Sequence, residues 1–358
     1  MNQERLHRVL TAMEEQHIPQ LLVSDPHAIF YLTGKWIHPG ERLLALYLTT
    51  GGKKILFVNE LFPITEDLGA ELVWLNDNQD GIAIVSQYLD PAAILGIDKN
   101  WPARFVLGLM ERNAVRGLVN GSPIIDQARM VKDKEEQALM RESSRLNDIA
   151  VQRMIALVGK GYTEKKMGKI LGDIWDELGA EGHSFDPIVA YGANAADPHH
   201  ANDDSLVKPG DSVILDIGCK YKSYCSDTTR TVFYQSVSDH ARDVYETVRT
   251  ANLKAIDLVK PGVRFCDIDA AARDYITSKG YGKYFTHRLG HCCGLEDHEG
   301  EDVSSVNTNP VQPGYVFSIE PGIYLPGDVG VRIEDLVIVT EDGCEVLNHT
   351  SKDLQIVE

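Results

Sequence analysis

Four acidic residues and one histidine in the C-terminal half of this 358-residue chain have the side chains and local contexts needed to bind metal ions. Each lies in a short distinctive segment, namely ILDIG, CSDTTRT, HRLGHCCG, SIEPG and VRIED, and the five residues are Asp216, Asp227, His291, Glu320 and Glu334. In two-metal hydrolytic centres, bridging carboxylates hold two divalent ions around one activated water. Any one of these acids alone would be interpreted as an ordinary strand-end carboxylate, but five in mutually consistent places predict an enzyme.

The spacing of the two aspartates predicts that they share one face of a hairpin. Asp216 and Asp227 are eleven residues apart, in the strand-like runs 212–218 and 224–233. If these runs pair antiparallel about Tyr221 and Lys222, the aspartates lie directly opposite each other, with Cβ atoms about 4.5 to 5.5 Å apart. Since two ions in such sites lie roughly 3.5 to 4 Å apart, one cross-strand pair can serve both.

The two glutamates repeat this construction further along the chain. The strand-like runs 316–323 and 331–339 flank the turn-rich segment LPGDVG, which places Glu320 and Glu334 symmetrically about Gly327. The sequence therefore predicts a second hairpin that presents a second pair of carboxylates.

His291 lies in a glycine-flanked segment, 290–294, where small residues permit close approach to a crowded site. One nitrogen among four carboxylates is a hard, oxygen-rich set of ligands that favours manganese, iron(II), cobalt or zinc over a thiolate-type site. An acid inside an apolar strand, such as Asp216, is costly to bury without a partner. The pattern thus favours two divalent metal ions, most of all Mn²⁺, with Co²⁺, Zn²⁺ or Fe²⁺ as alternatives.

These motifs resemble the metallopeptidase family with the pita-bread fold, which includes methionine aminopeptidase, aminopeptidase P and prolidase. The N-terminal half resembles the additional domain of prolidase, aminopeptidase P and creatinase, so the resemblance covers almost the whole chain. In the family pattern the metals are bound by the aspartates of D-x-G and S-D-x-T-R-T, the histidine of G-H-G-x-G, and the glutamates of E-P-G and R-x-E-D. These positions fall on Asp216, Asp227, His291, Glu320 and Glu334.

The same resemblance implies catalytic roles for four residues. His199, in DPHHAN, matches the histidine of the P-H motif, and His298, in LEDHEG, matches that of the v-H-E motif. Both would donate hydrogen bonds to a developing oxyanion, whereas His200 is expected to face away. Glu320 would also relay a proton to the leaving nitrogen. Arg332 resembles the family's arginine that orients the metal ligands.

The chain departs from the family pattern beside these motifs. Cys292 and Cys293 follow the ligand histidine where the family usually has glycine. They could act as ligands, as redox-sensitive thiols or as small apolar packing residues, and packing is favoured.

The segment HEGEDVSS lacks the arginine that some relatives have there, so the anchor for a substrate's C-terminal carboxylate is expected elsewhere. The candidate cations are Arg288 and, from the N-terminal loop YLTGKWIHPGERL of a neighbouring subunit, His38 and Arg42. Loops on rigid scaffolds often carry function.

By resemblance the substrate is a peptide with proline after the scissile bond. The two-domain size favours an Xaa-Pro dipeptidase over an Xaa-Pro aminopeptidase that acts on longer peptides, which remains the main alternative. A creatinase-like hydrolase works without metals and lacks these ligands, and a binding module without activity would be expected to have lost some of them. The resemblance also implies a homodimer.

Composition agrees with an enzyme of the cytoplasm. A net charge of −18 argues against nucleic-acid binding and against anionic membrane surfaces. No apolar run approaches the roughly 20 residues needed to span a membrane. The six cysteines lack zinc-finger spacing and suit a reducing compartment.

The order of predicted elements indicates an α/β (α+β) chain of two domains. Residues 1–125 are expected to form the creatinase/prolidase-like α/β domain, with a helix near 5–16 and strands at 20–23, 43–48 and 54–58. Residues 126–358 are expected to form the pita-bread domain. It would begin with a long amphipathic helix from near residue 132 and contain helices at 240–259 and 267–279.

Overall fold

The computed structural model describes residues 1–358 and divides into two compact units, Met1–Arg129 and Met130–Glu358. Both units combine helices with sheets, so the predicted mixed α/β class is confirmed. Along the chain, the boundary between the units falls at the end of helix α5 (Ser122–Met130), and the boundary predicted after residue 125 lies within this helix.

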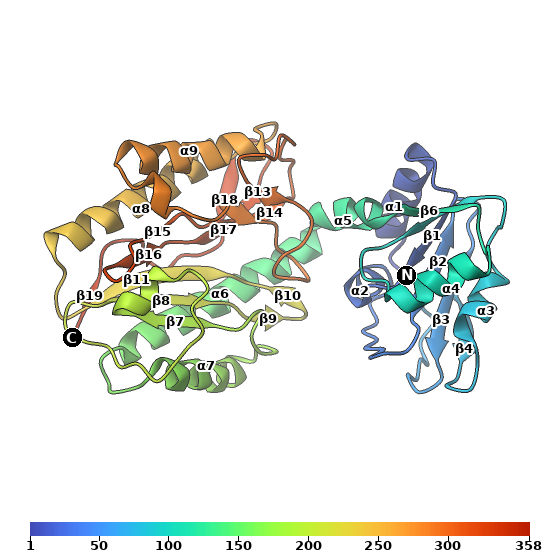
Figure 1. The fold of residues 1–358 in the computed structure, drawn as a ribbon, viewed down its shortest axis with the longest axis horizontal. Helices are drawn as coiled ribbons and strands as arrows, with labels where there is room; N and C mark the ends of the chain where they lie inside the picture. The colour runs from blue at the N-terminus through green and yellow to red at the C-terminus, as the bar shows by residue number, and fades with distance from the viewer. The chain divides into compact units, whose positions relative to one another are not determined.

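The N-terminal unit is a six-stranded sheet with flanking helices (Figure 1). The strand order is β4-β3-β2-β1-β5-β6, in which β1, β2 and β3 pair antiparallel and the other neighbours pair parallel. The strands are β1 (Gln20–Val23), β2 (Ala45–Thr49), β3 (Lys54–Asn59), β4 (Glu71–Leu75), β5 (Ile94–Ile97) and β6 (Gly117–Asn120). The helices besides α5 are α1 (Gln3–Glu15), α2 (Pro26–Thr33), α3 (Gly81–Ser86) and α4 (Ala103–Glu111).

The C-terminal unit places strands between two pairs of helices (Figure 1). Helices α6 (Lys134–Leu157) and α7 (Glu164–Leu178) lie on one side, and α8 (Asp239–Leu258) and α9 (Phe265–Ser278) lie on the other. One four-stranded sheet contains β7 (Ile188–Tyr191), β8 (Ser212–Ile217), β11 (Thr228–Tyr234) and β19 (Ile356–Val357). A three-stranded sheet contains β14 (Val316–Ile319), β17 (Asp335–Val339) and β18 (Cys344–Val346).

Three short strand pairs complete this unit: β9 (Lys220–Tyr221) with β10 (Tyr224–Cys225), β12 (Gly290–His291) with β13 (Asp302–Val303), and β15 (Gly322–Tyr324) with β16 (Gly330–Arg332). Short 3₁₀ helices lie at Gly192–Ala196 and Gly282–Tyr284.

Each pair of helices packs on its own apolar core. Leu146 and Trp175 of α6 and α7 pack in one buried cluster with Leu215 of β8. Val248 and Phe265 of α8 and α9 belong to another, with strand residues that include Phe317. Because the helices cover both outer sides of the strands, the polar side chains that face inward lie in a shielded space.

The long helix α6 begins where its sequence specifies a cap. The Asp133 side chain accepts from the backbone N–H of Glu136, and the Glu136 side chain accepts from that of Asp133, which forms a capping box. The amphipathic helix predicted from near residue 132 is therefore confirmed.

The first carboxylate hairpin has a register different from the predicted one. Its turn is formed by Lys222 and Ser223, with φ of 45° and 75°, one residue later than predicted. Two left-handed central residues match the strand twist in a two-residue hairpin turn. Asp216 consequently pairs with Thr229, and the prediction that it pairs with Asp227 is wrong. Because the shift is two residues along the partner strand, both aspartates still belong to the same face.

The second carboxylate hairpin is confirmed. Ile319 pairs with Asp335 in β14 and β17, and Gly322 pairs with Arg332 in β15 and β16. Both pairings belong to one register, which is centred on Gly327 with a φ of 76°. The same register sets Glu320 opposite Glu334.

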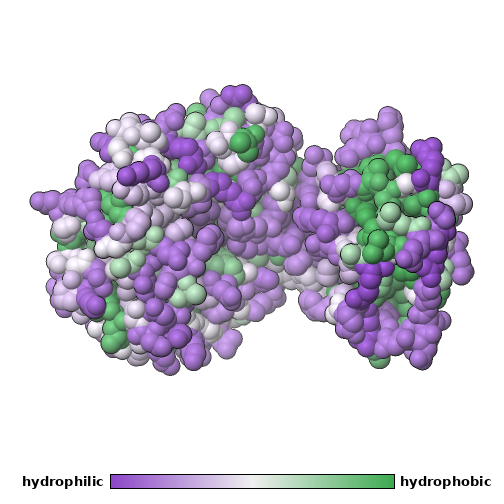
Figure 2. All heavy atoms as spheres, viewed as in Figure 1, coloured by the Kyte–Doolittle hydropathy of each residue, from purple (hydrophilic) through white to green (hydrophobic).

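Hydrophilic residues cover much of the face of the C-terminal unit shown in Figure 2, while apolar residues gather on part of the N-terminal unit. No helix combines the length and the apolar character required to cross a bilayer.

Candidate active site

The C-terminal unit contains a cavity of about 510 Å³ into which most of the predicted site residues face. Its lining includes all five predicted metal ligands and the predicted catalytic and substrate-binding residues His199, Arg288, His298 and Arg332. His38 and Arg42 belong to the N-terminal unit.

The predicted ligands come from strand ends that are far apart in sequence. Asp216 lies on β8, Asp227 immediately precedes β11, and His291 ends β12. The His291 Nε2 atom lies 3.5 Å from Asp227 Oδ2 and 3.4 Å from Glu320 Oε1. Asp227, His291 and Glu334 each offer a ligand atom within 4.8 Å of the others. These distances leave room for an ion between the side chains.

Several carboxylate oxygens in this cavity are buried and have no hydrogen-bond partner. Among them are Asp216 Oδ1, Asp227 Oδ1 and Glu334 Oε1. A buried ionised carboxylate without a partner is strongly unfavourable. The donor set of four carboxylates and one imidazole therefore fits divalent cations.

The pKa values in the cavity reflect the same crowding. Burial raises the pKa of Asp227 far above its usual range, and repulsion by Glu334 raises it further. Burial also raises the pKa of Glu334, to which Glu320 and Asp216 add. Burial raises the pKa of Glu320 to about 8, with a further increase from Asp216, although the nearby Arg332 lowers it. Divalent ions would favour the charged forms of all these acids.

The imidazole of His291 is held neutral. Burial, together with the neighbouring His298 and Arg288, lowers its pKa to about 3. Its Nδ1 atom lies 3.4 Å from the carbonyl oxygen of Cys292, which favours the tautomer with the proton on Nδ1. The Nε2 lone pair then faces the acids, as metal ligation requires.

Arg332 connects a predicted ligand to the cavity wall. Its Nη2 donates to Asp216 Oδ2 at 2.6 Å, its Nε donates to Thr229 Oγ1 at 3.1 Å, and its Nη1 donates to Tyr324 Oη at 2.8 Å. Thr229 Oγ1 also donates to Glu334 Oε2 at 2.7 Å. Arg332 and Thr229 thus orient two carboxylates, and the sequence spacing had identified only the arginine.

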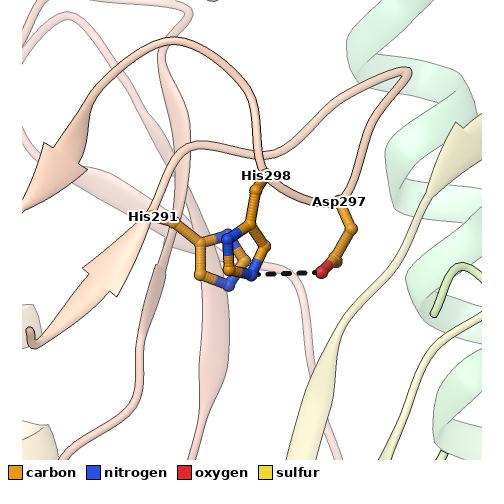
Figure 3. Close-up of side chains that lie close together, drawn as sticks. All are labelled: His291, Asp297 and His298. Carbon is orange, nitrogen blue, oxygen red and sulfur yellow. Dashed lines mark ion pairs between the residues drawn. The ribbon is translucent and has the colours of Figure 1, made fainter. Parts of the chain in front are cut away.

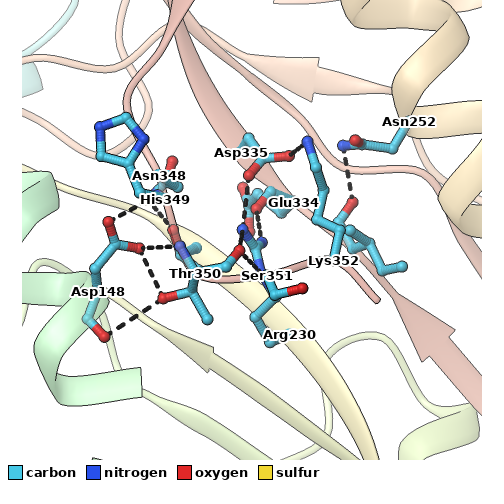
Figure 4. Close-up of polar contacts among 12 residues, drawn as sticks. Asp148, Arg230, Asn252, Glu334, Asp335, Asn348, His349, Thr350, Ser351 and Lys352 are labelled. Carbon is cyan, nitrogen blue, oxygen red and sulfur yellow. Dashed lines mark hydrogen bonds and ion pairs between the residues drawn. The ribbon is translucent and has the colours of Figure 1, made fainter. Parts of the chain in front are cut away.

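A polar network lies beneath Glu334 (Figure 4). Arg230 Nη1 donates to the Glu334 carbonyl oxygen at 2.6 Å, and Arg230 Nη2 forms a buried ion pair with Asp335 Oδ1 at 2.8 Å. Lys352 Nζ contacts the other Asp335 oxygen at 2.7 Å. In the C-terminal segment that carries Lys352, the backbone N–H of Thr350 donates to Asp148 of α6 at 3.0 Å. The network fixes the backbone at Glu334.

His298 stacks on His291, with ring centroids 3.7 Å apart and an angle of 22° between the planes (Figure 3). Arg288 Nη2 lies 2.7 Å from His298 Nδ1, and Arg288 Nη1 lies 2.6 Å from Asp302 Oδ1. Because arginine is only a donor, His298 accepts at Nδ1 and carries its proton on Nε2. Arg288 therefore positions His298, and its charge is shared with Asp302.

The structure adds Asp297, which the sequence interpretation did not select. Asp297 lines the cavity, and its Oδ2 lies 3.3 Å from His298 Nε2 (Figure 3). Burial raises its pKa to about 7, and Asp216 contributes to that increase. The sequence did contain an indication of Asp297, because this acid stands in LEDHEG at the position where the v-H-E motif has an apolar residue.

His287 and Tyr324 were also missed. His287 Nε2 lies 2.8 Å from Tyr324 Oη, and burial lowers the pKa of His287 to about 3. Tyr324 in turn accepts the hydrogen bond from Arg332 described above. His287 is the first residue of the segment HRLGHCCG, from which only His291 was selected, and Tyr324 lies outside the motifs. The fold brings His287 to the cavity wall, where Tyr324 contacts it.

His199 and His200 face different environments. His199 is exposed and lines the cavity, and its backbone N–H donates to Asp197 Oδ1 at 3.0 Å. His200 Nε2 instead lies 2.7 Å from Glu164 Oε2, a fully buried carboxylate of α7. Glu164 also accepts from the backbone N–H groups of Tyr191 and Asp203, so it anchors the loop that carries His199.

Glu299, which follows His298, forms a buried ion pair. Its Oε1 lies 2.6 Å from Lys132 Nζ, and the two side chains are 3% and 1% exposed. The acid after His298 is thus neutralised within the unit and does not face the cavity.

Cys292 and Cys293 are buried free thiols that do not line the cavity. Cys292 packs in the apolar core of this unit, and burial raises its pKa to about 12. Cys293 Sγ lies 3.9 Å from the carbonyl oxygen of Cys225. Both thiols pack as small apolar side chains, which agrees with the favoured interpretation.

The N-terminal loop holds its two candidate cations within its own unit. The His38 ring stacks on Trp36, with centroids 5.5 Å apart. Arg42 donates two hydrogen bonds of 2.8 Å to the carboxylate of Asp77.

Comparisons with known proteins cover the whole chain. Residues 138–341 match metallopeptidase family M24, and residues 5–131 match the creatinase/prolidase N-terminal domain. An uncharacterised peptidase of Staphylococcus aureus (strain MSSA476) is 34% identical over 97% of this chain and 99% of its own.

Two solved structures are similar over nearly their full lengths. A recombinant prolidase from Thermococcus sibiricus is 32% identical, with a TM-score of 0.94 over 100% of this chain and 99% of that chain. An Xaa-Pro dipeptidase from Bacillus anthracis is 29% identical, with a TM-score of 0.90 over 99% of each chain. The resemblance inferred from the motifs is confirmed, and with it the peptidase class. The chain belongs to metallopeptidase family M24 and carries the creatinase/prolidase N-terminal domain.

Proposed function

We propose that this enzyme hydrolyses Xaa-Pro dipeptides at a centre of two divalent metal ions, with Mn²⁺ as the preferred ion. The observation that carries the proposal is the group of buried, unpartnered carboxylate oxygens that surround His291 in one cavity. The full-length similarity to a prolidase and to an Xaa-Pro dipeptidase supports the substrate class.

The two carboxylate hairpins motivate an assignment of ligands. Asp227 and Glu334, one from each hairpin, would be shared by both ions, while Asp216 would serve one ion and His291 with Glu320 the other. When bound, such ions polarise the substrate carbonyl and lower the pKa of a water. Arg332 holds Asp216 in place through its 2.6 Å contact.

The histidines supply donors at the cavity wall. His298, held by Arg288 with its proton on Nε2, and the exposed His199 would donate hydrogen bonds to the oxyanion of the tetrahedral intermediate. Glu320, whose pKa lies near 8 in the metal-free protein, would carry the proton to the leaving proline nitrogen.

The anchor for the dipeptide carboxylate follows from the same accounting of charge. Arg288 is shared between Asp302 and His298, so it has limited capacity for a second anion. We propose a homodimer in the cytoplasm in which His38 and Arg42 of the neighbouring subunit contribute, with Arg42 exchanging its contact with Asp77 for the substrate carboxylate. Removal of either cation should then raise the KM for Xaa-Pro dipeptides more than for their C-terminally amidated forms. Equal effects on both substrates would reject this role.

A second candidate activity is an Xaa-Pro aminopeptidase that accepts longer peptides. A groove of about 670 Å³ shares Asp186, Ile188 and His199 with the cavity, and it offers space beyond a dipeptide. A panel of Xaa-Pro dipeptides and Xaa-Pro-Xaa tripeptides, assayed with Mn²⁺, Co²⁺ and Zn²⁺, separates the two. We expect faster cleavage of the dipeptides with Mn²⁺, whereas preference for tripeptides would favour the aminopeptidase, and no cleavage of either would reject the proposal.

A further inference from the structure

Asp297 is a carboxylate of the cavity that lies outside the five-ligand pattern. It stands directly before His298 and lines the same cavity as Asp216, Asp227, Glu320 and Glu334. Its side chain is 16% exposed. The v-H-E motif has an apolar residue at this position, so the acid is a property of this chain rather than of the pattern it resembles.

The two oxygens of Asp297 differ in their surroundings. Oδ2 lies 3.3 Å from His298 Nε2, whereas Oδ1 is buried and has no hydrogen-bond partner. Since a buried anionic oxygen is costly to leave unmatched, Oδ1 must be matched in the resting protein by a proton or by a cation, and a divalent ion would favour its charged form. A substrate ammonium group would be present only during turnover and does not meet this requirement.

The protein itself provides no such cation. Arg332 contacts Asp216 at 2.6 Å, and Arg288 contacts Asp302 at 2.6 Å. Arg288 and Lys220 act on Asp297 only through space, without a hydrogen bond or ion pair.

His291 connects Asp297 to the proposed metal centre. His291, Asp297 and His298 each offer a possible ligand atom within 4.8 Å of the others (Figure 3). His298 Nδ1 accepts from Arg288, and its Nε2 carries the proton and lies 3.3 Å from Asp297 Oδ2, so neither nitrogen offers a lone pair to an ion. This leaves His291 Nε2 and Asp297 Oδ1 as the two atoms of the group that remain available to bind an ion.

We propose that Asp297 is an additional carboxylate ligand of the ion bound by His291, so that this chain holds its metal pair with six side chains instead of five. The inference rests on the proposed two-metal centre. Four carboxylates balance two divalent ions in charge, and a fifth adds one negative charge and one oxygen. A six-coordinate, oxygen-rich ion such as Mn²⁺ gains more from that oxygen than Zn²⁺, which four ligands satisfy.

The test compares metal binding by the metal-free full-length protein and three variants. Asp297→Val installs the apolar residue of the motif, Asp297→Asn keeps the shape without the charge, and Asp186→Asn removes an acid from the exposed rim of the same cavity. Calorimetric titration with Mn²⁺ and with Zn²⁺ gives the number of ions and the affinity of each.

We expect the wild-type protein to bind two Mn²⁺ ions. In both Asp297 variants, one of the two ions should bind roughly 10- to 100-fold more weakly, which is the scale known for groups that support a metal site. The loss should be smaller for Zn²⁺ and absent in Asp186→Asn. If the Asp297 variants bind both Mn²⁺ ions as tightly as Asp186→Asn does, the inference is overturned while the two-metal centre stands. If the wild-type protein binds no divalent ion, both fail.

A measurement on the wild-type protein removes any dependence on the folding of the variants. In crystals loaded with Mn²⁺, Asp297 Oδ1 should lie about 2.0 to 2.6 Å from an ion, as carboxylate ligands do. A separation beyond about 3.5 Å, with both ions present, would reject direct ligation.

Discussion

At the scale of single residues, burial distinguishes the cavity acids from the other acids of this chain. Asp227 and Glu334 are 3% and 1% exposed, and each keeps one oxygen without a hydrogen bond. Surface acids such as Glu142 and Asp267 are instead paired with arginines, which lowers their pKa. The pKa of a carboxylate is therefore raised in the cavity and lowered at the surface. Only the buried carboxylates need a cation from outside the chain to stay charged.

Replacement of a bridging ligand should remove both ions. We expect Asp227→Ala and Glu334→Ala to lose the metal pair, whereas Asp216→Ala, which removes a ligand of a single ion, should retain one. Metal analysis by mass spectrometry after gel filtration measures the number of ions per chain. Two tightly held ions in Asp227→Ala or Glu334→Ala would contradict the bridging assignment.

Replacement of the oxyanion donors should spare the metals. His199→Ala and His298→Ala are expected to bind two ions but to lose roughly 10²- to 10³-fold in kcat, the effect of deleting one oxyanion donor. Steady-state kinetics at saturating Mn²⁺, together with metal analysis, separates this outcome from a loss of metal. Near-normal turnover in both variants would assign the histidines a purely structural role.

At the scale of elements, the two hairpins show what spacing predicts and what it does not. The register about Gly327 follows from a turn segment rich in glycine and proline, and it is confirmed. The other turn, at Lys222 and Ser223, contains two residues with positive φ and no glycine or asparagine, so its centre was predicted one residue early. Turns with positive φ usually contain glycine or asparagine, so a turn without them is recognised only from its backbone angles.

The buried pair beneath Glu334 should be important for stability. We expect Asp335→Ala to lower the free energy of unfolding of the C-terminal unit by about 3 to 5 kcal/mol, because it leaves Arg230 buried without its partner. The exposed pair Arg141–Glu345 is the matched control, and Glu345→Ala should cost only about 0 to 1 kcal/mol. Urea denaturation of the metal-free protein measures both. Similar small losses in the two variants would contradict the importance of the buried network.

At the scale of the whole molecule, removal of the metals should reverse the usual dependence of stability on pH. The folded-state pKa of Glu320 is raised to about 8 and that of Asp297 to about 7, both above the unfolded values near 4. The lowered pKa values of His287 and His291, both about 3, act in the opposite direction below about pH 6.5. Between about pH 6.5 and 8 the folded metal-free protein therefore binds more protons than the unfolded chain, and the free energy of unfolding falls as the pH rises. The carboxylates must release these protons when they ionise to bind metal.

The measurement is the Tm of the metal-free protein across this pH range, with and without saturating Mn²⁺. The Tm should decrease toward pH 8 without metal, and the stabilisation by Mn²⁺ should be largest at the alkaline end. A metal-free Tm that rises with pH would contradict the raised carboxylate pKa values.

The sequence predicted the two-domain α/β organisation and the group of side chains that share the cavity, because motifs around Asp216, His291 and Glu334 constrain residue type and order together. It did not predict Asp297, because the surrounding motif drew attention to His298 alone. Nor did it predict that Arg288 is engaged by Asp302 and His298. Such contacts depend on side-chain geometry between segments, which residue spacing does not specify.

The buried pair between Lys132 and Glu299 has a consequence for how this chain can be divided. The match to the peptidase family begins at residue 138, and the second compact unit begins at Met130. A fragment that started at residue 138 would contain every proposed metal ligand but would lack Lys132. Glu299 would then be a buried anion without its 2.6 Å partner, directly beside His298. The autonomous catalytic fragment must therefore begin ahead of residue 138, because Lys132 of the C-terminal unit belongs to the active-site scaffold.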